Sequence, residues 1–164
     1  MQKYTSAETS INLTRTPAIA KLVDWKPGTT NIDLGCGKKP ELLIEYLATQ
    51  GVTGVGIDPY NRTKLQNREA RAKVKKADTV TISNVLNVIK EKKYRRELLE
   101  TAKRLVKTTG KVYVTVYEGN KTGQGEATSK GWQENRATVD YVAELKKVFP
   151  DVKRVGKLLV CKHY

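Results

Sequence analysis

Several residue types that build chemical sites are scarce among the 164 residues of this chain. Its two cysteines, Cys36 and Cys161, are too few and too isolated for a disulfide framework or a zinc cluster. Its single histidine, His163, lies next to the C-terminus, where we expect a structural or exposed side chain. No apolar run approaches the roughly 20 residues of a membrane span, and no signal-peptide pattern opens the chain. We therefore expect a cytoplasmic protein without a metal site and without a membrane partner.

Acidic residues are also scarce relative to basic ones. Lys and Arg number 31 against 17 Asp and Glu, which gives a net charge of +14 and a pI near 9.8. A surplus of this size favours polyanions, so nucleic acid leads the candidate partners, with a soluble protein from a lysine-rich proteome as the alternative. The positive charge is concentrated at 62–76 and 89–107, which could form a phosphate-binding face or solvated surfaces.

The pattern of apolar residues predicts alternating strands and helices without repeats. The expected strands are 31–34, 52–58, 79–82 and 111–118, and the expected helices are about 40–50, 89–107 and 138–148. A loop is expected at 119–130, and an antiparallel strand pair at 152–155 and 157–161 closes the chain. The predicted class is therefore α/β, with a Rossmann-like, mostly parallel sheet that carries helices on both faces.

The length predicts a single domain over residues 1–164. Residues 1–28 are expected to be a helical segment that Pro17 interrupts, and residues 29–164 to be the α/β core. Between Asp58 and Asp78 lie 19 residues, which must hold any second helix and third strand. This is room for one short helix, and a third strand could be absent, so the sheet is predicted to be trimmed after its second strand.

Two motifs point to a nucleoside-bearing ligand. The stretch Thr30-Asn-Ile-Asp-Leu-Gly-Cys-Gly-Lys38 predicts a strand that runs into a glycine turn and a helix start. Val55-Gly-Ile-Asp58-Pro59-Tyr60 predicts a second strand that ends in an acid. A ligand at the carboxyl edge of a parallel sheet suits this arrangement, since Gly35 and Gly37 would let the backbone turn tightly beside it.

The residues after the glycine turn narrow the choice of ligand. Pro40 stands where a dinucleotide-binding fingerprint has its third glycine, which disfavours a nicotinamide or flavin enzyme. Lys38 and Lys39 could instead favour a phosphate, which keeps a nucleotide-binding alternative open.

The two motifs resemble those of class I S-adenosylmethionine-dependent methyltransferases, whose first motif reads acid-x-Gly-x-Gly and whose second strand ends in an acid. The resemblance covers about residues 30–118. It implies that Asp58 binds the ribose and that Pro59 and Tyr60 pack beside the adenine, for whose amino group Asp78 is a further candidate. The residues implied to line the methionine half of S-adenosylmethionine are Asp33, Gly35, Cys36 and Gly37.

The resemblance also places Ile82-Ser-Asn-Val-Leu-Asn-Val-Ile89 beside the transferred methyl group. Asn84 then points into the cofactor and transfer site, or else it caps the helix that follows. The two prolines and the aromatic residue of enzymes that methylate base amines are missing, and so is the Pro-Cys pair of cytosine-C5 enzymes. Glu118, at the end of a predicted strand, is a candidate site acid or an exposed strand terminus.

A third stretch could contact the acceptor. Trp132 could stack on a base while Gln133, Asn135 and Arg136 bind its edge or a phosphate, or Trp132 could close the core. Similar loops occur in methyltransferases associated with DNA modification, and that resemblance extends to Arg15-Thr-Pro17.

Together these features predict an S-adenosylmethionine-dependent methyltransferase that acts on nucleic acid, DNA or RNA. Two alternatives stay open. One is a non-catalytic basic nucleic-acid-binding protein on a degenerate methyltransferase fold, and the other is a methyltransferase of proteins or small molecules. A partner protein could supply the adenine wall that the trimmed sheet lacks.

Overall fold

The computed structural model describes residues 1–5 and 14–163. Six strands form one sheet in the order β2-β1-β3-β4-β8-β7, and β5 and β6 form a separate hairpin. The strands are β1 (Thr30–Leu34), β2 (Thr53–Ile57), β3 (Ala77–Ser83), β4 (Val106–Thr115), β5 (Glu126–Thr128), β6 (Gly131–Gln133), β7 (Asp151–Val155) and β8 (Leu158–Lys162). The helical elements are α1 (Ile19–Leu22), α2 (Glu41–Thr49), α3 (Lys64–Lys73), η2 (Leu86–Val88), α4 (Lys92–Leu105), η3 (Thr138–Tyr141) and α5 (Val142–Lys146).

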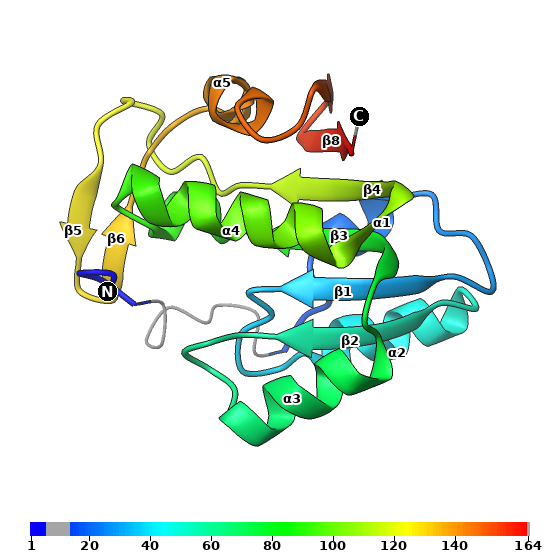
Figure 1. Ribbon diagram of the computed structural model, residues 1–164. Coiled ribbons are helices and arrows are strands. Elements are labelled where there is room, and N and C mark those ends of the chain that lie inside the picture. Colours follow the sequence, from blue (N-terminus) through cyan, green and yellow to red (C-terminus); the bar gives the residue numbers. More distant parts are fainter. Residues whose placement is uncertain (6–13, 164) are drawn as a thin grey trace.

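The sheet is mostly parallel and lies between two helical layers. Strands β1 to β4 pair in parallel, whereas β8 runs antiparallel to β4 and β7 antiparallel to β8. Helices α3 and α4 cover one face and α1 and α2 the other, and each face has its own apolar core. The β5–β6 hairpin and the N-terminus lie at the edge where the parallel strands end (Figure 1). The predicted fold class is confirmed.

The sheet is trimmed beyond its second strand, as predicted. Strand β2 is an edge strand, and the segment between it and β3 holds only α3. Helix α3 begins with a capping box, in which the Thr63 hydroxyl accepts the Gln66 N–H and the Gln66 side chain accepts the Thr63 N–H. The capping box fixes where α3 begins, and this helix takes up most of the short segment that leads to β3.

The N-terminal segment differs from its prediction. Instead of a helical segment over residues 1–28 that Pro17 interrupts, the described part of that range holds only the four-residue helix α1, and residues 6–13 lie outside the described residues. The indole Nε1 of Trp25 donates to the Ala20 carbonyl at 2.8 Å, which gives a partner to a carbonyl at the end of this short helix. The predicted loop at 119–130 is also partly wrong, because β5 occupies its end.

The transition from α4 to β4 was predicted too late in the chain. The helix ends at Leu105 and the strand starts at Val106, so Gly110 lies inside the strand and does not end the helix. A Cβ at Gly110 would stand 2.4 Å from the Asp78 carbonyl oxygen, so glycine allows the close approach of β4 to β3. The pairing register of β3 and β4 shifts at the same place.

No helix among the described residues is long and apolar enough to cross a membrane.

Candidate functional site

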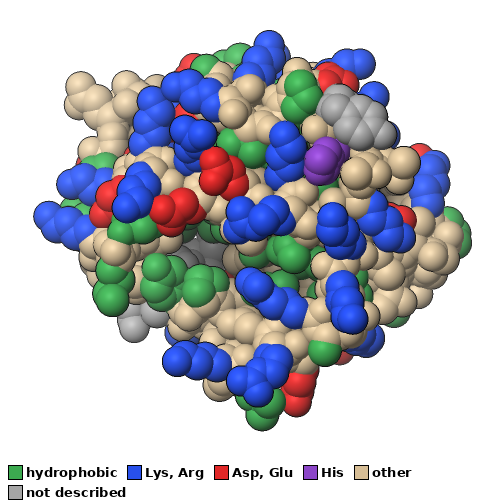
Figure 2. All heavy atoms as spheres, viewed as in Figure 1, with side chains coloured by type: hydrophobic (Ala, Val, Ile, Leu, Met, Phe, Trp, Pro, Cys, Tyr) green, Lys and Arg blue, Asp and Glu red, His purple; other side chains and the backbone are tan. Residues whose placement is uncertain are grey.

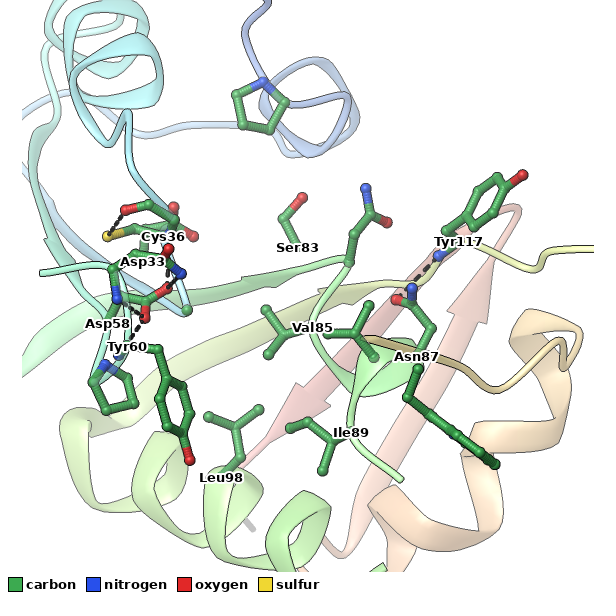
Figure 3. A pocket seen from close by; sticks show the side chains of 18 of the residues that line it. Asp33, Cys36, Asp58, Tyr60, Ser83, Val85, Asn87, Ile89, Leu98 and Tyr117 are labelled. Carbon is green, nitrogen blue, oxygen red and sulfur yellow. Dashed lines mark hydrogen bonds between the residues drawn. The ribbon is translucent and has the colours of Figure 1, made fainter. Parts of the chain in front are cut away.

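A cavity of about 310 Å³ opens at the carboxyl edge of the sheet, between the ends of β1, β2 and β3 and the β5–β6 hairpin. Figure 3 shows Asp33, Cys36 and Asp58 at one end of it and Asn87 and Tyr117 at the other. Ten of the candidate site residues line this cavity: Asp33, Gly35, Cys36, Gly37, Asp58, Pro59, Tyr60, Asn84, Trp132 and Gln133. Glu118 does not line it.

The glycine turn is fastened onto the end of β2. Gly35 and Gly37 have φ of +83° and +71°, a left-handed conformation that glycine adopts without a Cβ penalty. The N–H groups of Gly35 and Cys36 both donate to the Ile57 carbonyl, at 2.8 and 3.2 Å. A Cβ at Gly35 would stand 2.6 Å from Cγ2 of Val85, so a larger residue would push into the cavity wall.

Asp58 ties the two motifs together. Its buried carboxylate accepts the Gly37 N–H and the Tyr60 N–H, each at 2.9 Å. Asn61 donates its N–H at 2.9 Å and its side-chain amide at 3.2 Å. These four bonds match the roughly four lone-pair sites of a carboxylate. The Asn61 amide is the longest bond and also lines the cavity, so it is the contact that a ligand hydroxyl could replace.

Asp33 is held deep in the sheet, with the Thr81 hydroxyl donating to its Oδ1 at 2.8 Å. Three effects together raise the pKa of this carboxyl to about 7: desolvation, the largest, raises it, the Thr81 hydrogen bond lowers it, and the nearby charge of Asp58 raises it. Burial also raises the pKa of the Cys36 thiol, with the charges of Asp33 and Asp58 adding to the effect. Cys36 is thus a protonated turn residue and not an activated nucleophile.

The floor of the cavity is apolar and includes residues that sequence reasoning missed. Tyr60, Val85, Ile89 and Leu98 lie around the centre of the site in Figure 3. Leu98 comes from α4, and it carries no local signal, because only the tertiary arrangement brings this helix against the cavity.

The adenine candidate Asp78 lies elsewhere, and this prediction is wrong. It sits at the start of β3, where its carboxylate accepts the Thr30 N–H at 2.9 Å and pairs with the Lys107 ammonium at 2.9 Å. The start of a parallel strand is at the opposite edge of the sheet from the cavity.

The other half of the cavity is built from amides and aromatic rings. Asn84 has a left-handed backbone, with φ of +56°. The Asn87 amide donates to Oε1 of Gln133 at 3.2 Å, and its Oδ1 accepts the Tyr117 N–H at 3.3 Å. These bonds join the segment after β3 to the hairpin strand β6.

Trp132 is half-buried in this wall. Its ring stacks on Tyr4 with centroids 5.6 Å apart, and the Lys90 ammonium lies 4.6 Å from its ring centroid. Its Nε1 donates to Oε1 of Glu134 at 3.0 Å. Trp132 therefore lines the site but already has aromatic and cationic neighbours of its own.

Three further residues that we considered for the site face other partners. The Asn135 amide donates to the Gln124 carbonyl and to Glu126, both at 3.1 Å. Arg136 pairs with Glu134 at 3.2 Å. Glu118 accepts the Thr138 N–H at 2.7 Å and pairs with the Lys157 ammonium, so its role as a site acid stays a prediction.

A buried guanidinium joins the two walls. Arg95 belongs to the basic stretch 89–107, but it is only 6 % exposed. It donates to the Ile89 and Lys90 carbonyls at 2.8 Å each, and it pairs with Glu134 at 3.0 Å and Glu144 at 2.7 Å. Because Glu134 also accepts the Trp132 indole N–H, Arg95 links the segment before α4 to the hairpin.

No group of three or more metal-ligating side chains lies together within the described parts of the chain.

Comparisons with known proteins agree with this architecture. A family model described as a methyltransferase domain matches residues 11–145. Curated protein sequences give no significant match. Three similar solved structures are each less than 20% identical in sequence to the chain, a level at which the similarity shows the fold alone.

The first is CalO1, a methyltransferase in calicheamicin biosynthesis in its SAH-bound form, with 17% identity, a TM-score of 0.55, and coverage of 87% of this chain and 50% of that one. The second comes from the complex of the Haloferax volcanii Trm112 methyltransferase activator with a methyltransferase. It has 18% identity and a TM-score of 0.54, and the match covers 82% of this chain and 67% of that one.

The third is the Burkholderia thailandensis 1,6-didemethyltoxoflavin-N1-methyltransferase with that compound and S-adenosylhomocysteine bound. It has 14% identity and a TM-score of 0.60, and the match covers 82% of this chain and 70% of that one.

The chain spans about half of the length of CalO1. The family model, by contrast, covers most of the chain, and the sheet and the paired motifs are those of the class I fold. The chain therefore belongs to the methyltransferase domain family and has the class I fold.

Proposed function

We propose that this enzyme binds S-adenosylmethionine along the cavity and methylates nucleic acid. The observation that supports this position of the cofactor is that Asp33, the glycine turn and Asp58 all line one cavity at the ends of β1 and β2. The methionine half would lie against Asp33 and residues 35–37, the ribose at Asp58, and the adenine between Tyr60 and the apolar floor.

The chemistry of these residues fits that cofactor. A carboxylate at Asp33 can pair with the ammonium of the methionine half, and the neighbouring cation would in turn favour its charged form. The ribose hydroxyls would replace the 3.2 Å amide bond from Asn61 to Asp58. Tyr60, Val85 and Leu98 offer apolar surface to the adenine where the trimmed sheet has no further strand.

Bound S-adenosylmethionine supplies a methyl group that its sulfonium has already activated, so the protein has mainly to position the acceptor. Asn84 is the polar residue at the end of β3, and we place the acceptor beside it, against the wall that Trp132 and Tyr117 form. In this proposal Asn84 orients the acceptor by hydrogen bonding and Trp132 shapes its pocket.

Charge supports nucleic acid as the acceptor. The net charge is +14, and Lys and Arg outnumber Asp and Glu on the face that carries α3 and α4 (Figure 2). Methylation of a small molecule is the second candidate, because two of the similar proteins are a methyltransferase of calicheamicin biosynthesis and a 1,6-didemethyltoxoflavin-N1-methyltransferase. The Trm112 activator in the third structure suggests that a protein partner could complete this enzyme as well.

Calorimetry with S-adenosylhomocysteine tests the cofactor site. We expect binding by the wild type and a loss of at least about tenfold in affinity in Asp58→Asn, since the ribose hydroxyls lose a charged acceptor. Asp24→Asn is the control, because Asp24 is an exposed carboxylate paired with Lys26. Absence of binding by the folded wild type would overturn the proposed pose.

Transfer of radiolabelled methyl groups to RNA, DNA and a nucleic-acid-free small-molecule extract tests the acceptor. We expect label in nucleic acid, and label only in small molecules would move the assignment to the second candidate.

A further inference from the structure

A second hollow, of about 260 Å³, lies between α4 and α5, outside the cofactor cavity. We call it the α4–α5 groove. Its lining residues are Lys92, Lys93, Arg96, Leu99, Glu144 and Lys147. Four of these six carry a positive charge, so the groove is both concave and basic.

The one acidic residue of the groove is already neutralised. Glu144 accepts two bonds from the Arg95 guanidinium, at 2.7 and 3.1 Å, and one from Arg136 at 3.2 Å. Its side chain is 13% exposed, so little of its charge faces the groove. The negative charge at the floor therefore does not offset the four cations around it.

The cations themselves are available to a ligand. Within residues 1–5 and 14–163, Lys92, Lys93 and Lys147 have no carboxylate within 4.0 Å. Arg96 pairs with Glu100 at 2.9 Å, but both side chains are well exposed, so this pair is weak and exchangeable.

The groove and the cavity share a helix. Leu98 lines the cavity and Leu99 lines the groove, so the two hollows lie on adjacent sides of α4. A strand that presents a base to the cavity could continue over the start of α4 and lay its phosphates in the groove.

Helix α3 makes a useful contrast. It also carries exposed cations, but it has no buried residue, and none of its cations lines either hollow. Its charge lies on a convex surface, where only long-range attraction is expected.

We propose that the α4–α5 groove binds the sugar–phosphate backbone of the nucleic acid that the enzyme methylates. This inference rests on the proposed nucleic-acid acceptor and names the surface that holds it. The contacts are phosphate contacts, which position a strand without reading its sequence.

The test compares two triple variants with the same change in charge. Lys92→Gln/Lys93→Gln/Lys147→Gln alters the groove, and Lys64→Gln/Lys73→Gln/Lys75→Gln alters exposed lysines on and next to α3. Binding of short labelled RNA and DNA strands is measured by fluorescence anisotropy over a range of salt. We expect the groove variant to lower the slope of log affinity against log salt by about 2, at roughly 0.7 per lost phosphate contact, and the α3 variant to change it much less.

Equal effects of the two variants would overturn the groove, because net charge alone would then explain binding. Binding to polyglutamate is measured in the same way. If the wild type binds polyglutamate as tightly as nucleic acid, and the groove variant loses both affinities equally, the groove is assigned to an acidic protein instead. Calorimetry with S-adenosylhomocysteine separates the two proposals: a groove variant that still binds this ligand but no longer binds nucleic acid supports the groove. A wild type that binds nucleic acid through the groove but not S-adenosylhomocysteine would defeat the proposed cofactor pose and leave the groove standing.

Discussion

The two halves of the cavity are built in different ways. We call the part around Asp33, the glycine turn and Asp58 the cofactor half, after its proposed ligand; there Asp58 accepts three backbone N–H groups, and the Ile57 carbonyl holds the glycine turn. We call the part around Asn87 and Trp132 the acceptor half, after the proposed acceptor; there side chains also contact one another, as in the Asn87–Gln133 amide pair and the stack of Tyr4 on Trp132. A hydrogen bond made by a backbone group remains after most side-chain substitutions, whereas a contact between two side chains changes when either residue is substituted. The acceptor half can therefore vary while the cofactor half stays the same.

The largest effect on stability is expected from Gly35→Ala, which strains the backbone of the cofactor half. Both the φ of +83° and a Cβ 2.6 Å from Val85 oppose alanine, so we expect unfolding to become easier by about 3 kcal/mol. Binding of S-adenosylhomocysteine should be lost with it, since the turn cannot keep its place. Urea denaturation and calorimetry measure the two effects.

Gly28→Ala is the matched control for that variant. Gly28 has a φ of +81° but nothing within 4 Å of a Cβ, so it carries the same backbone strain without the clash. We expect it to lose about 1 kcal/mol of stability and to keep its affinity for S-adenosylhomocysteine. Equal losses in both variants would mean that the contact with Val85 is unimportant.

A second and smaller effect concerns the charge buried in the cofactor half. Because the pKa of Asp33 is raised to about 7, the folded protein keeps a proton that the unfolded chain releases near pH 4. Its stability should therefore fall as the pH rises from 5 to 8, by about 2–3 kcal/mol from this group alone, and level off above that range. Asp33→Asn should remove this decline and be the more stable protein at pH 8.

The same Asp33→Asn variant should bind S-adenosylhomocysteine more weakly at pH 8, because it cannot pair with the ammonium group. Denaturation with urea at several pH values measures the stability, and Asp24→Asn, on an exposed site, should leave the Asp33 decline intact. An Asp33→Asn protein whose stability still declines from pH 5 to 8 would assign the decline to other groups.

How far the sequence predicts each half follows from the same difference. The glycine turn and Asp58 are predictable because a strand, a turn and a helix start specify them within a few neighbouring residues. The short segment before β3 also predicts the trimmed sheet, since 19 residues cannot hold more. Leu98 could not be placed in the site, and Asp78 was placed wrongly, because their positions depend on which strand ends at which edge. Arg95 looks like a surface cation in the sequence until Glu134 and Glu144 come from distant segments to bury it.

The smallest effect is expected from Trp132→Phe, which tests whether the acceptor half is independent of the cofactor half. The variant keeps a ring against Tyr4 but loses the indole bond to Glu134, which should cost about 1 kcal/mol of stability. Trp25→Phe is the matched control, because the Trp25 indole also donates one hydrogen bond, to the Ala20 carbonyl, but in the apolar core beside α1 and α2, away from the cavity. We expect both variants to bind S-adenosylhomocysteine as the wild type does, and only Trp132→Phe to lower methyl transfer. If Trp132→Phe also weakens cofactor binding, the two halves are coupled, and the hydrogen bonds that connect them run from Glu134 to Arg95 and on to the carbonyl of Ile89, which lines the cavity.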